Sequence, residues 1–202
     1  MAAPVESYPA FVDLFERVKD KADLFAFLLF DDRPSHSSIK QFAEQNFSWL
    51  NALASAAEMY LFLPISLEGS AVENPSLKIA AEFGVIANRL PGIVFFTLYN
   101  DKTRVSSGTY FPLKPDEFKV EITHVEAVVA DLFSIIQEER RESGTPQRLL
   151  ANVTNRLNSL ARREQVRPIG KWLLSVGESL KSLPYDLAKA MVQAYGQGLA
   201  GR

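Results

Sequence analysis

The run Leu24-Phe25-Ala26-Phe27-Leu28-Leu29-Phe30 is the longest uninterrupted apolar stretch of the chain. It is followed at once by the polar residues Asp31-Asp32-Arg33-Pro34. A short continuous apolar run that is rich in aromatic residues is typical of a strand buried on both faces. Such strands belong to sheets that helices cover on both sides, so this run favours an α/β protein.

Helices are predicted before and after this strand, because apolar residues recur there every three or four positions. The pattern predicts helices at 8–21, 39–54, 75–83 and 115–142. Further strands are predicted at 59–67, 91–98 and 104–111. Pro64 interrupts the first of these, which suits an edge strand or a bulge.

The order of these elements predicts the sheet. Strands that are joined through helices favour parallel pairing with right-handed crossovers. The last two strands are separated only by the turn 99–102 and favour antiparallel pairing. We therefore expect an α/β sandwich around a mixed sheet.

Length and composition set the broad class. The chain has 202 residues, of which 47% are hydrophobic and 23% charged, as in a folded protein of one domain with an appendage. Its longest apolar run is far below the roughly 20 residues of a membrane span. The start lacks a basic segment followed by an apolar one, so we expect no secretory signal and a cytoplasmic location.

The chain has no cysteine, which excludes thiol redox chemistry, a thiol nucleophile and a zinc–thiolate site. No glycine-rich phosphate loop is present, and the two histidines do not form a cluster with metal-ligand spacing. We therefore expect no cofactor, no metal and no catalytic residue. A protein that is not an enzyme is favoured.

Charge divides the chain near Ser143-Gly144-Thr145-Pro146, a turn-like string. Residues 1–142 carry a net charge of −8 and residues 143–202 a net charge of +6. This change of sign predicts an acidic domain at 1–142 and a basic helical extension at 143–202. Amphipathic helices are predicted within the extension at 146–163, 169–183 and 187–195.

Three short amphipathic helices are not stable alone, so they must pack on the body, on each other or on a partner. The favoured interpretation is a helical subdomain with a solvated arginine face. The charge also fits an acidic protein, including the acidic body of a second copy in a homodimer, or an anionic membrane surface. Nucleic acid is not expected, because the charge is modest and aromatic residues are not interleaved with basic ones.

Two stretches carry a resemblance to a known family: the buried run 24–30, and Asn74-Pro-Ser-Leu-Lys-Ile-Ala-Ala-Glu-Phe-Gly-Val-Ile-Ala-Asn-Arg-Leu-Pro-Gly-Ile-Val-Phe-Phe. Over roughly residues 8–142 the chain resembles the thioredoxin-like superfamily. In that family a short helix ends in a glycine-valine pair, here Gly84-Val85, and a cis-proline then opens a central strand, here Pro91. The resemblance implies a cis Leu90-Pro91 bond beside the loop that precedes Ile39.

The family has its two-cysteine motif in that loop, where this chain has Asp32-Arg33-Pro34-Ser35-His36-Ser37-Ser38. Serine cannot replace a thiolate in disulfide exchange. The resemblance therefore implies a redox-inactive member that binds proteins or peptides, as a chaperone, scaffold or adaptor. An extended segment is expected to pair with the main chain there. The implied binding residues are Asp32, Arg33, Ser35, His36, Ser38, Leu90 and Pro91.

The serines of this loop have three further interpretations. Helix capping is the simplest, and a nucleophilic serine would need a base and an orienting group, for which Asp31, Asp32 and His124 are the evident candidates. A thioredoxin-like part followed by helices also resembles the glutathione transferases. That resemblance implies that Ser35 or Ser37 stabilises a bound glutathione thiolate.

Overall fold

The computed structural model describes residues 1–66, 73–102, 105–113, 122–162 and 178–179. Its strands are β1 Ala2–Pro4, β2 Leu24–Leu29, β3 Met59–Leu63, β4 Gly92–Leu98, β5 Val105–Pro112 and β6 Glu178–Ser179. Its α-helices are α1 Tyr8–Val18, α2 Ser37–Gln45, α3 Phe47–Ala56, α4 Ser76–Glu82, α5 Ile122–Glu142 and α6 Pro146–Arg162. Two short 3-10 helices are η1 Pro34–His36 and η2 Ala87–Arg89.

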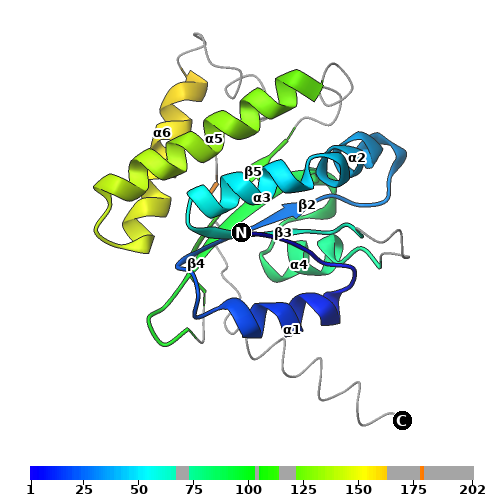
Figure 1. Cartoon of the computed structure of the whole chain (residues 1–202), viewed down its shortest axis with the longest axis horizontal. Coiled ribbons are helices and arrows are strands. Elements are labelled where there is room, and N and C mark those ends of the chain that lie inside the picture. Colours follow the sequence, from blue (N-terminus) through cyan, green and yellow to red (C-terminus); the bar gives the residue numbers. More distant parts are fainter. Residues whose placement is uncertain (67–72, 103–104, 114–121, 163–177, 180–202) are drawn as a thin grey trace.

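The strands form one mixed sheet in the order β1-β3-β2-β4-β5-β6 (Figure 1). β1 and β2 both run parallel to β3, which lies between them, whereas β4 is antiparallel to β2 and to β5. The prediction of an α/β fold around a mixed sheet, with parallel crossovers and an antiparallel hairpin, is confirmed.

Alternate residues of each central strand point to opposite faces of the sheet, and each face has its own helices. Phe25 and Phe27 of β2 pack with α1 and α4, whereas Ala26 and Leu28 pack with α2, α3, α5 and α6. Figure 1 shows α1 and α4 on one side of the sheet and α2, α3 and α5 on the other. β2 is buried along its whole length, as its continuous apolar sequence predicts.

The sequence pattern does not predict β1, because a three-residue segment has no alternation to detect. β1 pairs with β3, so β3 is an internal strand. The prediction that Pro64 marks an edge strand or a bulge is therefore wrong. β3 ends at Leu63, and Pro64 lies directly after it, where a missing N–H removes no ladder bond.

Residues 39–54 were expected to form one helix but form two, α2 and α3. Asn46 separates them, with φ −107° and ψ 19°. Its side-chain Nδ2 donates to the carbonyl of Phe42 at 3.1 Å. A short amide side chain that bonds to the main chain in this way competes with the regular helical pattern.

Hydrogen bonds close both ends of α4, which begins at Ser76, directly after Pro75. Asn74 Oδ1 accepts a hydrogen bond from the N–H of Ser76 at 3.0 Å, which satisfies a free donor of the first turn. At the other end Gly84 has a φ of 68°, and Val85 N–H donates to the Ala80 carbonyl at 2.8 Å. This glycine-dependent ending turns the chain towards η2.

The basic extension begins with α6, which packs on the body. Leu149, Leu150 and Val153 are buried in the same cluster as Phe111 of β5 and Ile136 of α5. The apolar stripe predicted for this helix therefore covers the sheet. The predicted start of the preceding helix, at residue 115, lies outside the described residues.

Most of the remaining extension lies outside the described residues, including the predicted helix 187–195 and most of 169–183. Glu178 and Ser179 form β6, so the prediction of a helix is wrong at these two positions. A two-residue strand follows its partner, β5, and has no periodicity of its own. None of the described helices is both long and apolar enough to cross a bilayer.

Candidate functional site

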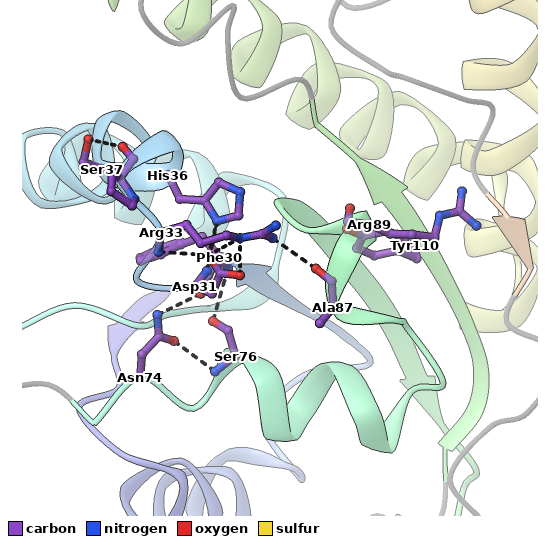
Figure 2. Close-up of polar contacts among 11 residues, drawn as sticks. Phe30, Asp31, Arg33, His36, Ser37, Asn74, Ser76, Ala87, Arg89 and Tyr110 are labelled. Carbon is purple, nitrogen blue, oxygen red and sulfur yellow. Dashed lines mark hydrogen bonds and ion pairs between the residues drawn. The ribbon is translucent and has the colours of Figure 1, made fainter.

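The candidate site lies at the carboxyl end of β2, where the chain leaves the sheet at Phe30 (Figure 2). The N–H of Phe30 donates to Ser76 Oγ at 3.2 Å, and Asn74 Nδ2 donates to the Phe30 carbonyl at 2.8 Å. Both partners come from the start of α4. The loop that follows Phe30 therefore begins from a fixed position.

The carboxylate of Asp31 accepts hydrogen bonds from several groups of this loop. Its Oδ1 lies 3.1 Å from the main-chain nitrogen of Arg33, 2.9 Å from Arg33 Nε and 2.6 Å from His36 Nδ1. Burial acts to raise the pKa of Asp31, but hydrogen bonds from Arg33 and the nearby positive charge outweigh it and lower the pKa below 3.8. Asp31 is thus an ionised acceptor at neutral pH.

His36 is the most deeply buried of the three side chains, with 2% exposed. Burial lowers its pKa below 6.5, against the opposing effect of Asp31. An ionised carboxylate only accepts, so the 2.6 Å contact assigns the ring proton to Nδ1 rather than leaving Nδ1 to accept from the Asp31 N–H at 3.2 Å. His36 is a neutral donor that orients the carboxylate.

Arg33 joins the loop to a second segment, far away in the sequence. Its Nη2 donates to the carbonyl of Ala87 in η2 at 3.1 Å, and Figure 2 shows the side chain reaching across. Its side chain is 47% exposed. η2 leads directly into the Leu90-Pro91 bond, which is cis as expected.

The same segment is held from β5 by Tyr110. Tyr110 Oη donates to the Arg89 carbonyl at 2.6 Å, and burial raises the pKa of this phenol, so it remains a donor. The ring fills the space beside Gly92, where an added Cβ would lie 2.3 Å from Tyr110 Oη. Glycine is therefore required directly after the cis-proline.

Main-chain groups around the cis bond are largely occupied. The N–H of Leu90 donates to the Ala87 carbonyl at 3.3 Å, and the Pro91 carbonyl accepts from Leu113 N–H at 2.8 Å. The carbonyl before Leu90 is held by Tyr110. The geometry does not favour the expected main-chain pairing with an extended segment at Leu90, and a ligand would meet side chains instead.

The serines of the loop do not form a catalytic arrangement. Ser37 Oγ donates to the Pro34 carbonyl at 2.8 Å. Ser38 Oγ is buried and has no partner among the described residues, and Ser35 is half-buried. Within the part of the chain that the structure describes, no hydrogen bond joins one of these serines to His36. The side chain of His124, the other candidate base, lies outside that part.

The remaining predicted residues differ in what they expose. Asp32 is exposed at the tip of the loop, whereas Leu90 and Pro91 are buried and shape the segment. Two large apolar side chains are exposed close by in the chain: Ile86, 60% exposed, precedes Ala87, and Leu77, 50% exposed, follows Ser76. The two segments that hydrogen-bond to Arg33 and to Phe30 therefore each carry an exposed apolar side chain.

Sequence reasoning found Arg33 and His36 but did not find how they are organised. Asp31, at the centre of the polar network, was named only as a candidate base or orienting group for a serine, a role that its contacts with Arg33 and His36 do not support. Tyr110 and Ile86 have no sequence signal, since their roles depend on contacts between distant segments. Among the described residues, no three His, Asp or Glu side chains are grouped to hold a metal ion.

No model of a protein family matches this chain, and neither a curated protein nor a solved structure matches it. Its function is therefore inferred from the chemistry of its own residues. The useful features are a fixed polar loop, a cis-proline segment tied to it, and a half-exposed arginine between them.

Proposed function

We propose that this chain is a redox-inactive, thioredoxin-like protein that acts in the cytosol by noncovalent binding of a protein or peptide. The binding surface consists of the loop from Asp32 to Ser38 and the segment from Ile86 to Pro91. One observation carries the proposal: Arg33 stands half exposed while its guanidinium is held between Asp31 and Ala87.

Several features of the fold support the thioredoxin-like assignment. The resemblance implies parallel strands joined through helices, an antiparallel hairpin, and a cis-proline that opens a central strand beside the loop after β2. The sheet has parallel β2–β3 and antiparallel β4–β5 pairs, and Leu90-Pro91 is cis at the start of β4. The chain has no cysteine, which excludes thiol exchange at this loop, and noncovalent binding is the function that the resemblance implies for it.

The surface favours a ligand with both apolar and acidic groups. Ile86 and Leu77 offer exposed apolar area, and such area next to a fixed polar group is typical of binding sites. Arg33 can donate hydrogen bonds to an acidic group of the ligand, since its side chain is half exposed. Because the network already holds Arg33, little conformational freedom is lost on binding.

Peptides selected from a random displayed library provide the test. Their affinity is measured for the native chain, for Arg33→Glu and for Ile86→Asp, with Arg148→Glu and Tyr99→Asp as exposed controls on α6 and at the β4–β5 turn. We expect the first two variants to weaken binding about tenfold or more, and the controls to change it less than about twofold. Equal affinities for all five proteins would overturn the proposed surface.

The glutathione transferase hypothesis has less support, because Ser37 Oγ is engaged by the Pro34 carbonyl. Retention on immobilised glutathione together with conjugating activity would overturn the noncovalent proposal. The membrane hypothesis also has less support from α6, whose apolar residues Leu149, Leu150 and Val153 are buried on the sheet. Salt-sensitive binding to anionic vesicles that is lost on deletion of 146–202 would favour that hypothesis.

A further inference from the structure

The carboxylate of Asp31 couples a half-exposed side chain to a buried one. Arg33 Nε lies 2.9 Å from its Oδ1 and 2.6 Å from its Oδ2. His36 Nδ1 lies 2.6 Å from the same Oδ1. Arg33 is half exposed, whereas His36 is buried. A ligand can therefore reach the guanidinium while the imidazole stays beneath the surface, and one carboxylate contacts both.

The charges of this cluster cancel at neutral pH. Asp31 is ionised, Arg33 is a permanent cation, and the ring of His36 is neutral. An acidic group of a ligand therefore meets a site without net charge. Because Nδ1 already carries one ring proton, a second proton would add to Nε2 and give the cluster a net positive charge.

The charges that act on the imidazole come from its own loop. His36 lies in η1, which packs on α2. Burial is the largest influence on the pKa of His36 and lowers it. Among the described residues, the charges that act on this pKa are those of Asp31, which raises it, and Arg33, which lowers it. The other charged side chains of this loop and of α2 are Asp32, Lys40 and Glu44.

The two segments that are bonded to this loop contribute neutral groups. η2 provides the carbonyl of Ala87. The start of α4 provides Asn74 and Ser76, which hold the main chain of Phe30. Figure 2 shows the Arg89 guanidinium directed away from the loop. Protonation of the imidazole is therefore a change that alters the charge of the cluster near neutral pH.

An acidic ligand would reverse one of the effects on His36. The guanidinium of Arg33 disfavours a charged imidazole, and a carboxylate that pairs with this guanidinium offsets its positive charge. A proton on the ring thus costs less when the ligand is bound. Because coupling between two binding events is reciprocal, the same proton must strengthen binding of the carboxylate by the same factor.

We propose that this loop binds a peptide carboxylate with uptake of a proton by His36, so that affinity rises as the pH falls below neutral. The ligand group is the side-chain carboxylate of an aspartate or glutamate, which pairs with Arg33. The proton comes from solvent and adds to Nε2, while Asp31 holds the imidazolium through Nδ1. This inference rests on the proposed function, because it assigns a regulation to the same binding surface.

The probe is a peptide from the displayed library that binds the native chain, contains Asp or Glu but no histidine, and has an amidated C-terminus. A second peptide replaces each Asp and Glu by Asn and Gln. Calorimetry at about pH 7.5 and about pH 6, in buffers of different protonation enthalpy, gives both the affinity and the proton uptake.

We expect the native chain to bind the acidic peptide about threefold or more tightly at the lower pH, with uptake of about 0.3 proton or more per peptide. His36→Gln should show neither effect, since it has no group to protonate. Asn152→Gln, an exposed neutral change on α6, should match the native chain. A pH dependence that His36→Gln retains, or that the neutral peptide shows equally, would overturn this inference and leave the binding surface intact.

Two other outcomes of the selection are decisive. Peptides that bind without any acidic residue would overturn this inference alone, whereas a library that yields no binding peptide would overturn the proposed function with it. The coupling is also measurable without a ligand, from the pH titration of the His36 ring resonances. Arg33→Gln should move their midpoint to higher pH, and Arg148→Gln on α6 should not. An unchanged midpoint in Arg33→Gln would overturn the inference.

Discussion

The two ends of the β2–β4–β5 part of the sheet are held in different ways. At the carboxyl end of β2, Asn74 and Ser76 fix Phe30, and Arg33 ties the loop to η2. At the opposite end, Lys102 Nζ lies 2.9 Å from Asp23 Oδ1 and 3.3 Å from the Ala22 carbonyl. At the first end, Ser76 and Asn74 bond to main-chain groups of the buried residue Phe30, whereas at the second end Lys102 pairs with the carboxylate of Asp23, which is 56% exposed.

The more strongly stabilising polar interactions therefore lie at the carboxyl end of β2. Buried hydrogen bonds to the main chain are costly to remove, whereas exposed ion pairs contribute little. The loop end is therefore rigid before any ligand arrives, and a rigid surface loses less entropy on binding. Variants at the carboxyl end of β2 should therefore lose more free energy of unfolding than variants at the opposite end.

The largest effect is expected for Gly92→Ala. The new Cβ would lie 2.3 Å from Tyr110 Oη and 2.4 Å from Cζ of a ring that is 2% exposed. Since the ring has no room to move, we expect a loss of about 2–4 kcal/mol in the free energy of unfolding, measured by urea denaturation. Gly144→Ala is the control, because nothing lies within 4 Å of its added Cβ. Similar losses for both variants would contradict the packing described here.

A smaller effect is expected for Asn74→Ala. It removes the acceptor for Ser76 N–H and the donor to the Phe30 carbonyl. Because both partners are shielded, we expect a loss of about 1–2 kcal/mol in the free energy of unfolding. Asn152→Ala, which removes a bond between exposed side chains, should cost less than about 0.5 kcal/mol. Equal costs would show that the end of β2 does not depend on α4.

A pH-dependent effect is expected from His36. Its folded pKa lies below the unfolded value of 6.5, so the unfolded chain binds the proton first as the pH falls. The stability gained from the neutral ring is complete above about pH 6.5 and is lost as the pH falls through the folded pKa. Urea midpoints measured from about pH 7.5 to about pH 5 should fall less steeply for His36→Gln.

Asn152→Gln is the control for this pH series, since it replaces one exposed neutral side chain by another. It should keep the slope of the native chain. The carboxylate of Asp31 contributes in a separate window: its folded pKa lies below 3.8, so its stabilisation is present above that value and is lost only at lower pH. If the urea midpoint of His36→Gln falls with pH as steeply as that of the native chain, the burial of a neutral imidazole is contradicted.

The smallest effect is expected for Lys102→Ala at the opposite end. The carboxylate partner Asp23 is 56% exposed, so water screens the ion pair. We expect a change of less than about 0.5 kcal/mol in the free energy of unfolding, which decreases further with added salt. A loss as large as that of Asn74→Ala would remove the contrast between the two ends.

Much of the fold could be predicted because burial leaves a pattern in the sequence. The run 24–30 predicts a strand buried on both faces, and Gly84 predicts the end of α4. β1 and β6 could not be predicted, because strands of two or three residues depend on a partner strand for their structure. The break at Asn46 was hidden by apolar residues that continue at helical spacing across it.

The position of the loop beside the Leu90-Pro91 bond could be predicted, but the hydrogen bonds that hold the two segments could not. The resemblance placed the loop at Asp32–Ser38 beside Leu90-Pro91, and the cis bond is present. The use of Leu90 N–H within η2 depends on the exact turn of the chain, which no local pattern specifies. The same is true of Tyr110, which acts across 21 positions of the sequence.

The binding surface is tested most directly by following the main-chain amide resonances of the isotope-labelled native chain while a selected peptide is added. We predict the largest shifts at Arg33–His36 in the loop and at Ile86–Leu90 before the cis-proline. Shifts confined to the β4–β5 turn near Lys102, with the loop unchanged, would contradict a binding function for the carboxyl end of β2.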